Sequence, residues 1–587
     1  MARQTGSLAL VLHCHLPYVL SHGRWPHGAD WLNEAAAETY VPLVRMLNRL
    51  LAEGRKPRLT VDVSPVLTEM LADEAFRGEF EGYLTQKIEA ARADQAEFER
   101  LGDHAMRRLA ARWEAWYGEV RSDFVDTYGG DLVGALRSLQ DRGAVEIITC
   151  GATHGYFPLL SRDTSIQAQV KQAVSSYRRH FHRPPRGIWL PECAYRPSYV
   201  WQAPVDPEPP QPRKGVEEFL SENGIEYFVV DAHLLRGGKA IGVYMDRFDL
   251  LQRLFERYVK ERGEMETRPE TPRTPYEVYY VASKPAMRPV AIFTRDTNTA
   301  LQVWSGQHGY PGDGNYLDFH KKRFPGGLRY WAVTDTRADL ADKGPYDPEA
   351  AQSRLHPQAV HFRDLVKATL AQQAATTRRP GVLTAPYDAE LFGHWWFEGV
   401  GWLEEVLRLV EDDPDIGVTT CGTHLDARRE EGRPVDVIAL PEGSWGEGGH
   451  HYIWLNQDTA WTWKHVYEAE RTLPALLQRA TSDRLARDPT LERVLRQAAR
   501  ELLLLQASDW QFLIATVAAR DYAELRVARH AEDFRGLAAI ARRALDAGPP
   551  ARLAPEEEAL VATLEARDRL FPDLDLAWWR AVEHPAR

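Results

Sequence analysis

Short apolar, β-branched runs recur along the first 420 residues of this 587-residue chain, and this repetition constrains its fold more than any other feature. Such runs are expected to form strands. They occupy residues 7–12, 59–63, 145–149, 187–190, 226–230, 290–294, 382–384 and 417–420. Helix-compatible stretches such as 34–51 and 165–180 separate many of them. Repeated β-α units of this kind predict a parallel sheet or barrel in the α/β class.

The placement of reactive side chains favours the barrel. Several residues with catalytic or binding chemistry follow a predicted strand directly: His13, His15, His154, Glu192, Asp231, Arg295, Asp296 and Asp388. Parallel barrels carry their active sites at the end where the strands finish. We therefore expect these side chains to meet around one cavity.

Three segments interrupt or follow the barrel pattern. Residues 73–142 lack proline and keep a helical apolar spacing, which predicts an inserted helical subdomain. A charged excursion at 243–280 predicts a partly helical lid loop. After residue 425 the strand signals fade, so 426–587 is predicted to be a C-terminal helical domain. The catalytic barrel is then expected in 1–72 and 143–425.

Charge and cysteine content exclude some classes of protein. The 72 basic and 84 acidic residues give a net charge of −12, which provides no general attraction for nucleic acid or an anionic membrane. No apolar run approaches the roughly 20 residues that cross a bilayer, and the N-terminal run is too short for a signal peptide. The four cysteines lie far apart without paired spacing, which favours a reducing cytoplasm. Tryptophan is abundant, with 18 residues, and flat aromatic faces suit sugar rings.

The His13-Cys14-His15 sequence ends the first predicted strand, where alternation places both imidazoles on one side. Paired histidines bind a metal or donate hydrogen bonds to a polar ligand. A metal would need a third ligand, which Asp62, His154 or Asp231 could supply. That combination would indicate a metal-dependent deacetylase on a similar barrel.

Two carboxylates, Glu192 and Asp388, are delivered by separate predicted strands. Such a pair could flank one glycosidic bond, with one acid attacking the anomeric carbon and the other protonating the leaving oxygen. A lone acid is as often a helix cap or an ion-pair partner. Aromatic neighbours that could shield the acids and stack on sugars favour the catalytic interpretation: Trp189, Tyr387, Trp395 and Trp396.

Several longer motifs, in this order, resemble those of glycoside hydrolase family 57. They are His13-Cys14-His15-Leu16-Pro17-Tyr18, Ala152-Thr153-His154-Gly155-Tyr156, Trp189 to Pro197 and Pro386 to Trp396. Further matches surround Trp304, Trp445, Trp454 and Asp509, so the resemblance covers nearly the whole chain. It implies 1,4-α-glucan branching, by cleavage of an α-1,4 linkage and transfer of the chain to a 6-hydroxyl.

The resemblance also implies an architecture and roles for individual residues. The fold would be an incomplete TIM-like barrel of seven β/α units with an inserted helical subdomain and a C-terminal helical domain. Glu192 would be the nucleophile and Asp388 the general acid/base, without metal or cofactor. An α-glucan such as amylose or a glycogen precursor would contact His13, His15, Trp31, His154, Arg295, Trp304, Trp395, Trp445, Trp454 and Asp509. For the last three this requires the C-terminal domain to fold back against the barrel mouth.

The family's lid carries a tyrosine associated with transfer in preference to hydrolysis, and Tyr244 is our candidate for it. The sequence departs from the family pattern here, with a longer, charged segment that contains further tyrosines at Tyr258 and Tyr276. An α-amylase or 4-α-glucanotransferase using the same carboxylates therefore stays open, as does a non-catalytic glucan-binding protein. Retention of configuration would require carboxyl groups about 5 to 5.5 Å apart. It also requires an ionised Glu192 and an Asp388 whose pKa is raised.

Overall fold

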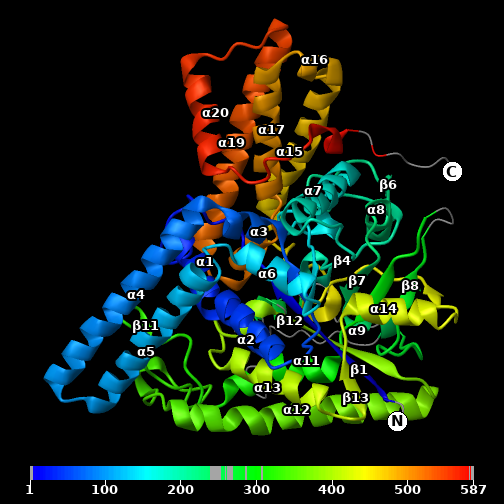
Figure 1. Ribbon diagram of the computed structural model, residues 1–587. Helices are drawn as coiled ribbons and strands as arrows, with labels where there is room; N and C mark the ends of the chain where they lie inside the picture. The colour runs from blue at the N-terminus through cyan, green and yellow to red at the C-terminus, as the bar shows by residue number, and fades with distance from the viewer. Residues whose placement is uncertain are drawn as a thin grey trace.

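The computed structural model describes residues 4–237, 269–283, 287–305 and 309–580, with a few scattered positions between 253 and 260 and residue 582 (Figure 1). Two mainly parallel sheets form its centre. Their barrel strands are β1 (Gly6–Cys14), β2 (Leu59–Val63), β3 (Val145–Ile148), β4 (Gly187–Ile188), β7 (Tyr227–Val230), β9 (Ala291–Thr294) and β12 (Gly381–Asp388). These positions confirm the repeated strands expected from the sequence.

The seven strands follow one another around the barrel in the order β1-β2-β3-β4-β7-β9-β12. The barrel is incomplete in the sense that it has one strand fewer than the eight of a TIM barrel. β12 pairs with β1 in parallel from Gly6 to His13. Single parallel bridges join the two sheets, one between Thr149 and Ile188 and one between Arg295 and Thr384. Because all these strands run in one direction, their carboxyl ends share one end of the barrel, as predicted for the α/β fold.

Shorter strands extend the sheets at their margins. β13 (Ile416–Val418) pairs with the first residues of β1, β8 (Tyr279–Val281) runs antiparallel to β9, and β14 (Val437–Ile438) pairs with β8. The proline-rich stretch 204–212 ends in one of a pair of hydrogen-bonded strands. There β6 (Gln211–Arg213) lies antiparallel to β5 (Tyr199–Trp201). A two-stranded ribbon tolerates Pro212 because both of its strands are edges.

Helices cover the barrel on its outside. They are α1 (Ala29–Ala35), α2 (Val41–Ala52), α3 (Pro65–Ala72), α7 (Asp163–Phe181), α8 (Val216–Glu222), α9 (Ala232–Arg236), α11 (Thr297–Trp304), α12 (Pro348–Thr377), α13 (Gly399–Glu411) and α14 (Cys421–Glu430). Strands β1 and β2 are almost wholly buried, as expected when helices cover one face and the barrel interior the other.

A long helical hairpin projects from the barrel, drawn in blue at the left of Figure 1. It consists of α4 (Glu74–Leu101) and α5 (His104–Ser122). The side chain of Asp73 caps the start of α4, Gly102 adopts the left-handed conformation that ends it, and Asp103 caps α5. After the hairpin, α6 (Leu132–Asp141) packs against α2, α3 and β3. The domain boundaries at 72/73, 142/143 and 425/426 stay predictions.

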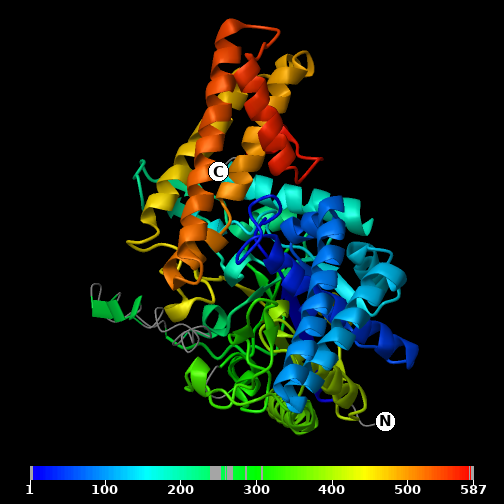
Figure 2. The ribbon, with the colours of Figure 1, turned by 90° about the vertical axis from the view of Figure 1, so that its left-hand side faces the viewer.

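The C-terminal helices stand over the end of the barrel where the strands finish, drawn in orange and red in Figures 1 and 2. They are α15 (Ala460–Arg479), α16 (Ser482–Ala486), α17 (Pro489–Leu505), α18 (Asp509–Thr516), α19 (Arg520–Ala547) and α20 (Pro555–Arg567). The apolar stripe from Leu491 to Leu505 is buried, and α17 packs along α19. Within the described residues, no helix is long and apolar enough to cross a membrane.

Candidate active site

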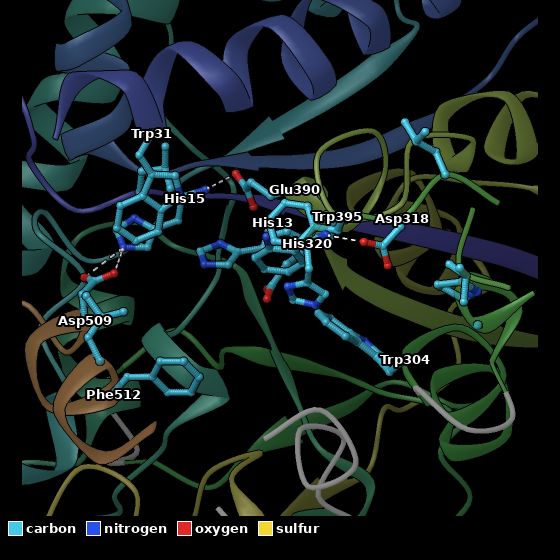
Figure 3. A pocket seen from close by; sticks show the side chains of 18 of the residues that line it. His13, His15, Trp31, Trp304, Asp318, His320, Glu390, Trp395, Asp509 and Phe512 are labelled. Atoms are coloured by element: carbon cyan, nitrogen blue, oxygen red, sulfur yellow. Dashed lines mark hydrogen bonds and ion pairs between the residues drawn. The ribbon is translucent and has the colours of Figure 1, made fainter. Parts of the chain in front are cut away.

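A cavity of about 740 Å³ opens at the carboxyl ends of the barrel strands, with Asp509 and Phe512 of α18 in its wall (Figure 3). Most of the predicted site residues line it: His13, His15, Trp31, His154, Glu192, Trp304, Asp388, Trp395, Trp445 and Asp509. Trp445 and Asp509 belong to the segment that follows the barrel. The C-terminal region therefore forms one wall of the cavity, as the proposed roles of these two residues require.

Glu192 lies in a short 3-10 turn just after β4, and its backbone is left-handed, with φ 60° and ψ 26°. The turn carries its carboxylate into the cavity. Trp445 secures the residue twice: its indole Nε1 donates to Glu192 Oε2 at 2.8 Å, and its backbone N donates to the Glu192 carbonyl at 3.1 Å. A non-glycine residue held in this conformation by two specific bonds is typical of a functional site.

Burial raises the pKa of Glu192 to about 7, and the hydrogen bond from Trp445 opposes this rise. The sequence interpretation expects an ionised nucleophile, whereas a pKa of about 7 leaves Glu192 only partly ionised at neutral pH. The physical reason is desolvation, which penalises the charged form of a buried carboxyl. Attack requires the carboxylate, so kcat/KM should increase with pH through about 7.

Replacing Trp445 with Phe should shift the acidic limb of the pH profile, which is the rise of kcat/KM with pH, to higher pH. The indole N–H stabilises the carboxylate form, and its loss should raise the pKa of Glu192 by about 1 to 2 units. Trp31→Phe removes an indole N–H elsewhere in the cavity and should leave the limb near 7. The measurement is kcat/KM against pH with a soluble maltooligosaccharide. An unshifted limb in Trp445→Phe would show that this bond does not control the ionisation of Glu192.

Asp388 is the last residue of β12, level with His13 of β1 in the parallel register. It is half-buried and faces the same cavity as Glu192. Beyond it, the buried Glu390 accepts from the backbone N of His15 at 3.0 Å and from the hydroxyl of Tyr40 (Figure 3). Two acids from opposite halves of the barrel therefore face one space, while a third fixes the backbone beside them.

In each of the three cavity histidines, both ring nitrogens lie within hydrogen-bond distance of another side chain. His15 contacts Ser64 Oγ through Nδ1 at 2.8 Å and the Asp509 carboxylate through Nε2 at 3.1 Å. His13 contacts Asp62 through Nδ1 and His154 through Nε2, and His154 contacts Ser508 through Nδ1. A glucan hydroxyl can reach one of these nitrogens only by replacing a protein partner.

Two clusters that include the cavity histidines bring potential metal ligands within 4.8 Å of one another: His13, Asp62 and Cys150, and His15, His154 and Asp509. The rings of His15 and His154 are stacked, with centroids 4.0 Å apart and 12° between their planes. Imidazole lone pairs lie in the ring plane, so two parallel stacked rings do not aim at one ion. Asp231, the other acid considered as a ligand, pairs with Arg295 instead.

Three predicted substrate-contacting residues do not line the described cavity. Trp454 is fully buried and stacks on Tyr156, with ring centroids 4.4 Å apart. Arg295 is buried and lies over the ring of Trp445 at 5.8 Å. Tyr244 falls outside the described residues. Direct contact of these three with a glucan stays a prediction.

Part of the cavity wall comes from residues that the sequence interpretation missed. They include Asp318, Phe319, His320, Lys343 and Phe512. Lys343 Nζ forms a buried ion pair with Asp318 Oδ2 at 2.6 Å. Most of these residues lie in an irregular segment between α11 and α12, where no strand or helix periodicity marks a side chain as inward-facing. The only signal was aromatic content, which core residues share.

A seven-stranded barrel with two acids in an aromatic-walled cavity is the arrangement expected of an enzyme that cleaves glycosidic bonds. The family model described as glycosyl hydrolase family 57 matches residues 9–441. A second model, described as the C-terminal part of 1,4-alpha-glucan branching enzyme, matches residues 465–579. The chain belongs to glycosyl hydrolase family 57.

Several relatives are similar over most of their length. A 1,4-alpha-glucan branching enzyme of Thermococcus kodakarensis is 41% identical over 533 residues, which cover 91% of this chain and 73% of that protein. A crystal structure of the branching enzyme of Pyrococcus horikoshii superimposes with a TM-score of 0.85 at 39% identity, covering 99% and 98% of the two chains. The alpha-amylase AmyC of Thermotoga maritima gives a TM-score of 0.78 at 27% identity, covering 98% and 100%.

Proposed function

We propose that this protein is a 1,4-α-glucan branching enzyme that acts on amylose-like or glycogen-precursor chains. One observation carries the proposal: Glu192 and Asp388 face a single cavity that the C-terminal segment closes with Trp445 and Asp509. The similarity to branching enzymes over nearly the whole chain supports it. The proposed setting is the cytoplasm, which the four buried, unpaired cysteines support.

The proposed reaction is a double displacement. Glu192 attacks the anomeric carbon while Asp388 protonates the departing 4-oxygen, which leaves a glycosyl ester on Glu192. Asp388, now ionised, deprotonates the 6-hydroxyl of a second glucan, and that oxygen displaces the ester. Two inversions at the anomeric carbon retain the α-configuration. The new linkage is α-1,6 because the acceptor oxygen is O6.

The wall around the acids supplies binding and protection from water. Trp31 and Trp395 are partly exposed and offer flat faces for glucose rings along the cavity. Trp304 lines the cavity but is fully buried, so its contact with a glucan stays a prediction. We propose that Asp509 and its partner His15 contact the hydroxyls of the bound chain, since both line the cavity. The proposed role of Tyr244 in favouring transfer over hydrolysis depends on the lid segment.

The alternative candidate is α-glucan hydrolysis, favoured by the similarity to an alpha-amylase at 27% identity. Proton NMR of amylose incubated with the purified protein and EDTA separates the two. New α-1,6 anomeric signals are expected. Reducing ends without α-1,6 signals would establish hydrolysis, and redistributed linear chains would establish 4-α-glucanotransfer. Activity that EDTA abolishes would revive a metal-dependent mechanism.

A further inference from the structure

Along one wall of the cavity, a continuous line of hydrogen bonds joins the barrel to the C-terminal region. His13 of β1 and Asp62 of β2 are register partners, and His13 Nδ1 lies 2.5 Å from Asp62 Oδ2. His13 Nε2 lies 3.2 Å from His154 Nε2, and His154 Nδ1 lies 2.8 Å from Ser508 Oγ. All four side chains are buried. The series Asp62–His13–His154–Ser508 is called the imidazole chain below.

Counting protons leaves two arrangements in which both imidazoles are neutral. If Asp62 is ionised, it accepts from His13 Nδ1–H, His154 Nε2–H donates to His13, and Ser508 donates to His154. If Asp62 is protonated, every bond reverses: Asp62 donates to His13 Nδ1, His13 Nε2–H donates to His154, and His154 Nδ1–H donates to Ser508. The second arrangement holds one more proton, and each nitrogen changes between donor and acceptor.

The surroundings of Asp62 favour the protonated arrangement. Asp62 Oδ1 is buried and has no hydrogen-bond partner among the described residues. An ionised carboxylate with an unsatisfied buried oxygen would be costly, whereas a neutral acid tolerates that position better. Burial and the nearby Glu390 carboxyl both raise the pKa of Asp62 well above its usual value.

The other groups that face the imidazole chain do not reverse this preference. Burial, and then the nearby His15, lowers the pKa of His13 and His154 well below the usual range. Cys150 of the barrel has its pKa raised by burial, so it stays a neutral thiol. The Asp509 carboxylate on the C-terminal side is already engaged with His15.

We propose that Asp62 is a positioning residue that acts as a buried neutral acid, fixes the tautomers of His13 and His154, and keeps this wall of the cavity uncharged. The inference rests on the proposed function. Glycosidic cleavage passes through a transition state with positive charge on the sugar. An imidazolium in the wall would repel that charge, and a neutral imidazole does not. His13 stacks on Trp189 with ring centroids 4.9 Å apart, and Trp189 is three residues before Glu192, so the wall lies close to the reacting centre.

Substitutions at position 62 separate this role from a purely structural one. Asp62→Asn keeps a neutral donor for His13 Nδ1 and should retain kcat and KM close to those of the parent. Asp62→Leu breaks the imidazole chain and should lower kcat/KM by about 100-fold, mainly through kcat, because the imidazoles lose their fixed orientation. Val61→Ala removes buried volume from the same strand on its opposite face and should lower the melting temperature without this loss. An Asn variant as impaired as the Leu variant would overturn the neutral-acid role.

Nitrogen NMR of histidine-labelled protein reads the tautomers without any substrate. The parent and Asp62→Asn should show His13 as the Nε2–H form and His154 as the Nδ1–H form, with neither titrating between pH 5 and 8. His13→Gln and His154→Gln assign the two signals. In Asp62→Leu, His13 should lose its fixed tautomer. An imidazolium signal, or the reverse tautomers in the parent, would overturn the proposal. A protein with the expected tautomers but no action on glucans would contradict the proposed function alone.

Discussion

Glu192→Gln should lower kcat for glucan transfer by on the order of 10⁴- to 10⁶-fold, the scale of loss when a covalent nucleophile is removed. The amide has nearly the same shape as the carboxylate, and its oxygen can still accept from Trp445 Nε1. Binding of amylose should therefore change little. The measurement is the initial rate of α-1,6 linkage formation, together with amylose affinity in the same variant.

Glu217 provides a matched control for the loss of a buried acid. It is also buried, burial also raises its pKa to about 7, and it accepts from the hydroxyl of Tyr195 at 2.7 Å. It is not among the residues that line the cavity. Glu217→Gln should keep a rate close to that of the parent. Equal losses in both variants would mean that Glu192 supports the fold and does not attack the sugar.

The barrel could be predicted from the sequence because its strands are short, apolar and regularly followed by chemically reactive residues. Strand β2 was placed at its observed bounds, and Glu192 and Asp388 were assigned to the strand ends that face the cavity. Parallel strands need long connections, usually helices. A sequence in which strand patterns alternate with helix patterns therefore predicts parallel strands, and it also predicts that the site lies at their carboxyl ends. The proposed roles of the two acids drew on family resemblance.

Other features depend on contacts between residues far apart in the chain. The bond from Trp445 to Glu192 joins positions 253 residues apart, and the ionisation of Glu192 depends on the burial that this packing produces. Arg295, predicted to contact the substrate, is buried over the ring of Trp445 and pairs with Asp231, and the sequence indicated neither contact. The irregular segment with Asp318 gave no periodic signal at all.

Asp388→Asn should impair glucan cleavage by roughly 10²- to 10⁴-fold, the usual contribution of a general acid/base, and the loss should depend on the leaving group. An amylose oxygen must be protonated as it departs, whereas fluoride leaves without a proton. With α-maltosyl fluoride the variant should therefore still release fluoride in a first turnover at a rate close to that of the parent. The second step needs Asp388 as a base, so the glycosyl ester on Glu192 should accumulate and be visible by mass spectrometry.

Asp509→Asn is the matched comparison, because Asp509 lines the same cavity and its proposed role is to contact the bound chain. A binding residue interacts with both substrates before any bond breaks, so this variant should slow amylose cleavage and fluoride release by similar factors. If Asp388→Asn also slowed both reactions equally and no ester accumulated, Asp388 would be acting on the bound sugar and not on the leaving oxygen. The ratio of the two rates, rather than either rate alone, therefore distinguishes proton transfer from substrate binding.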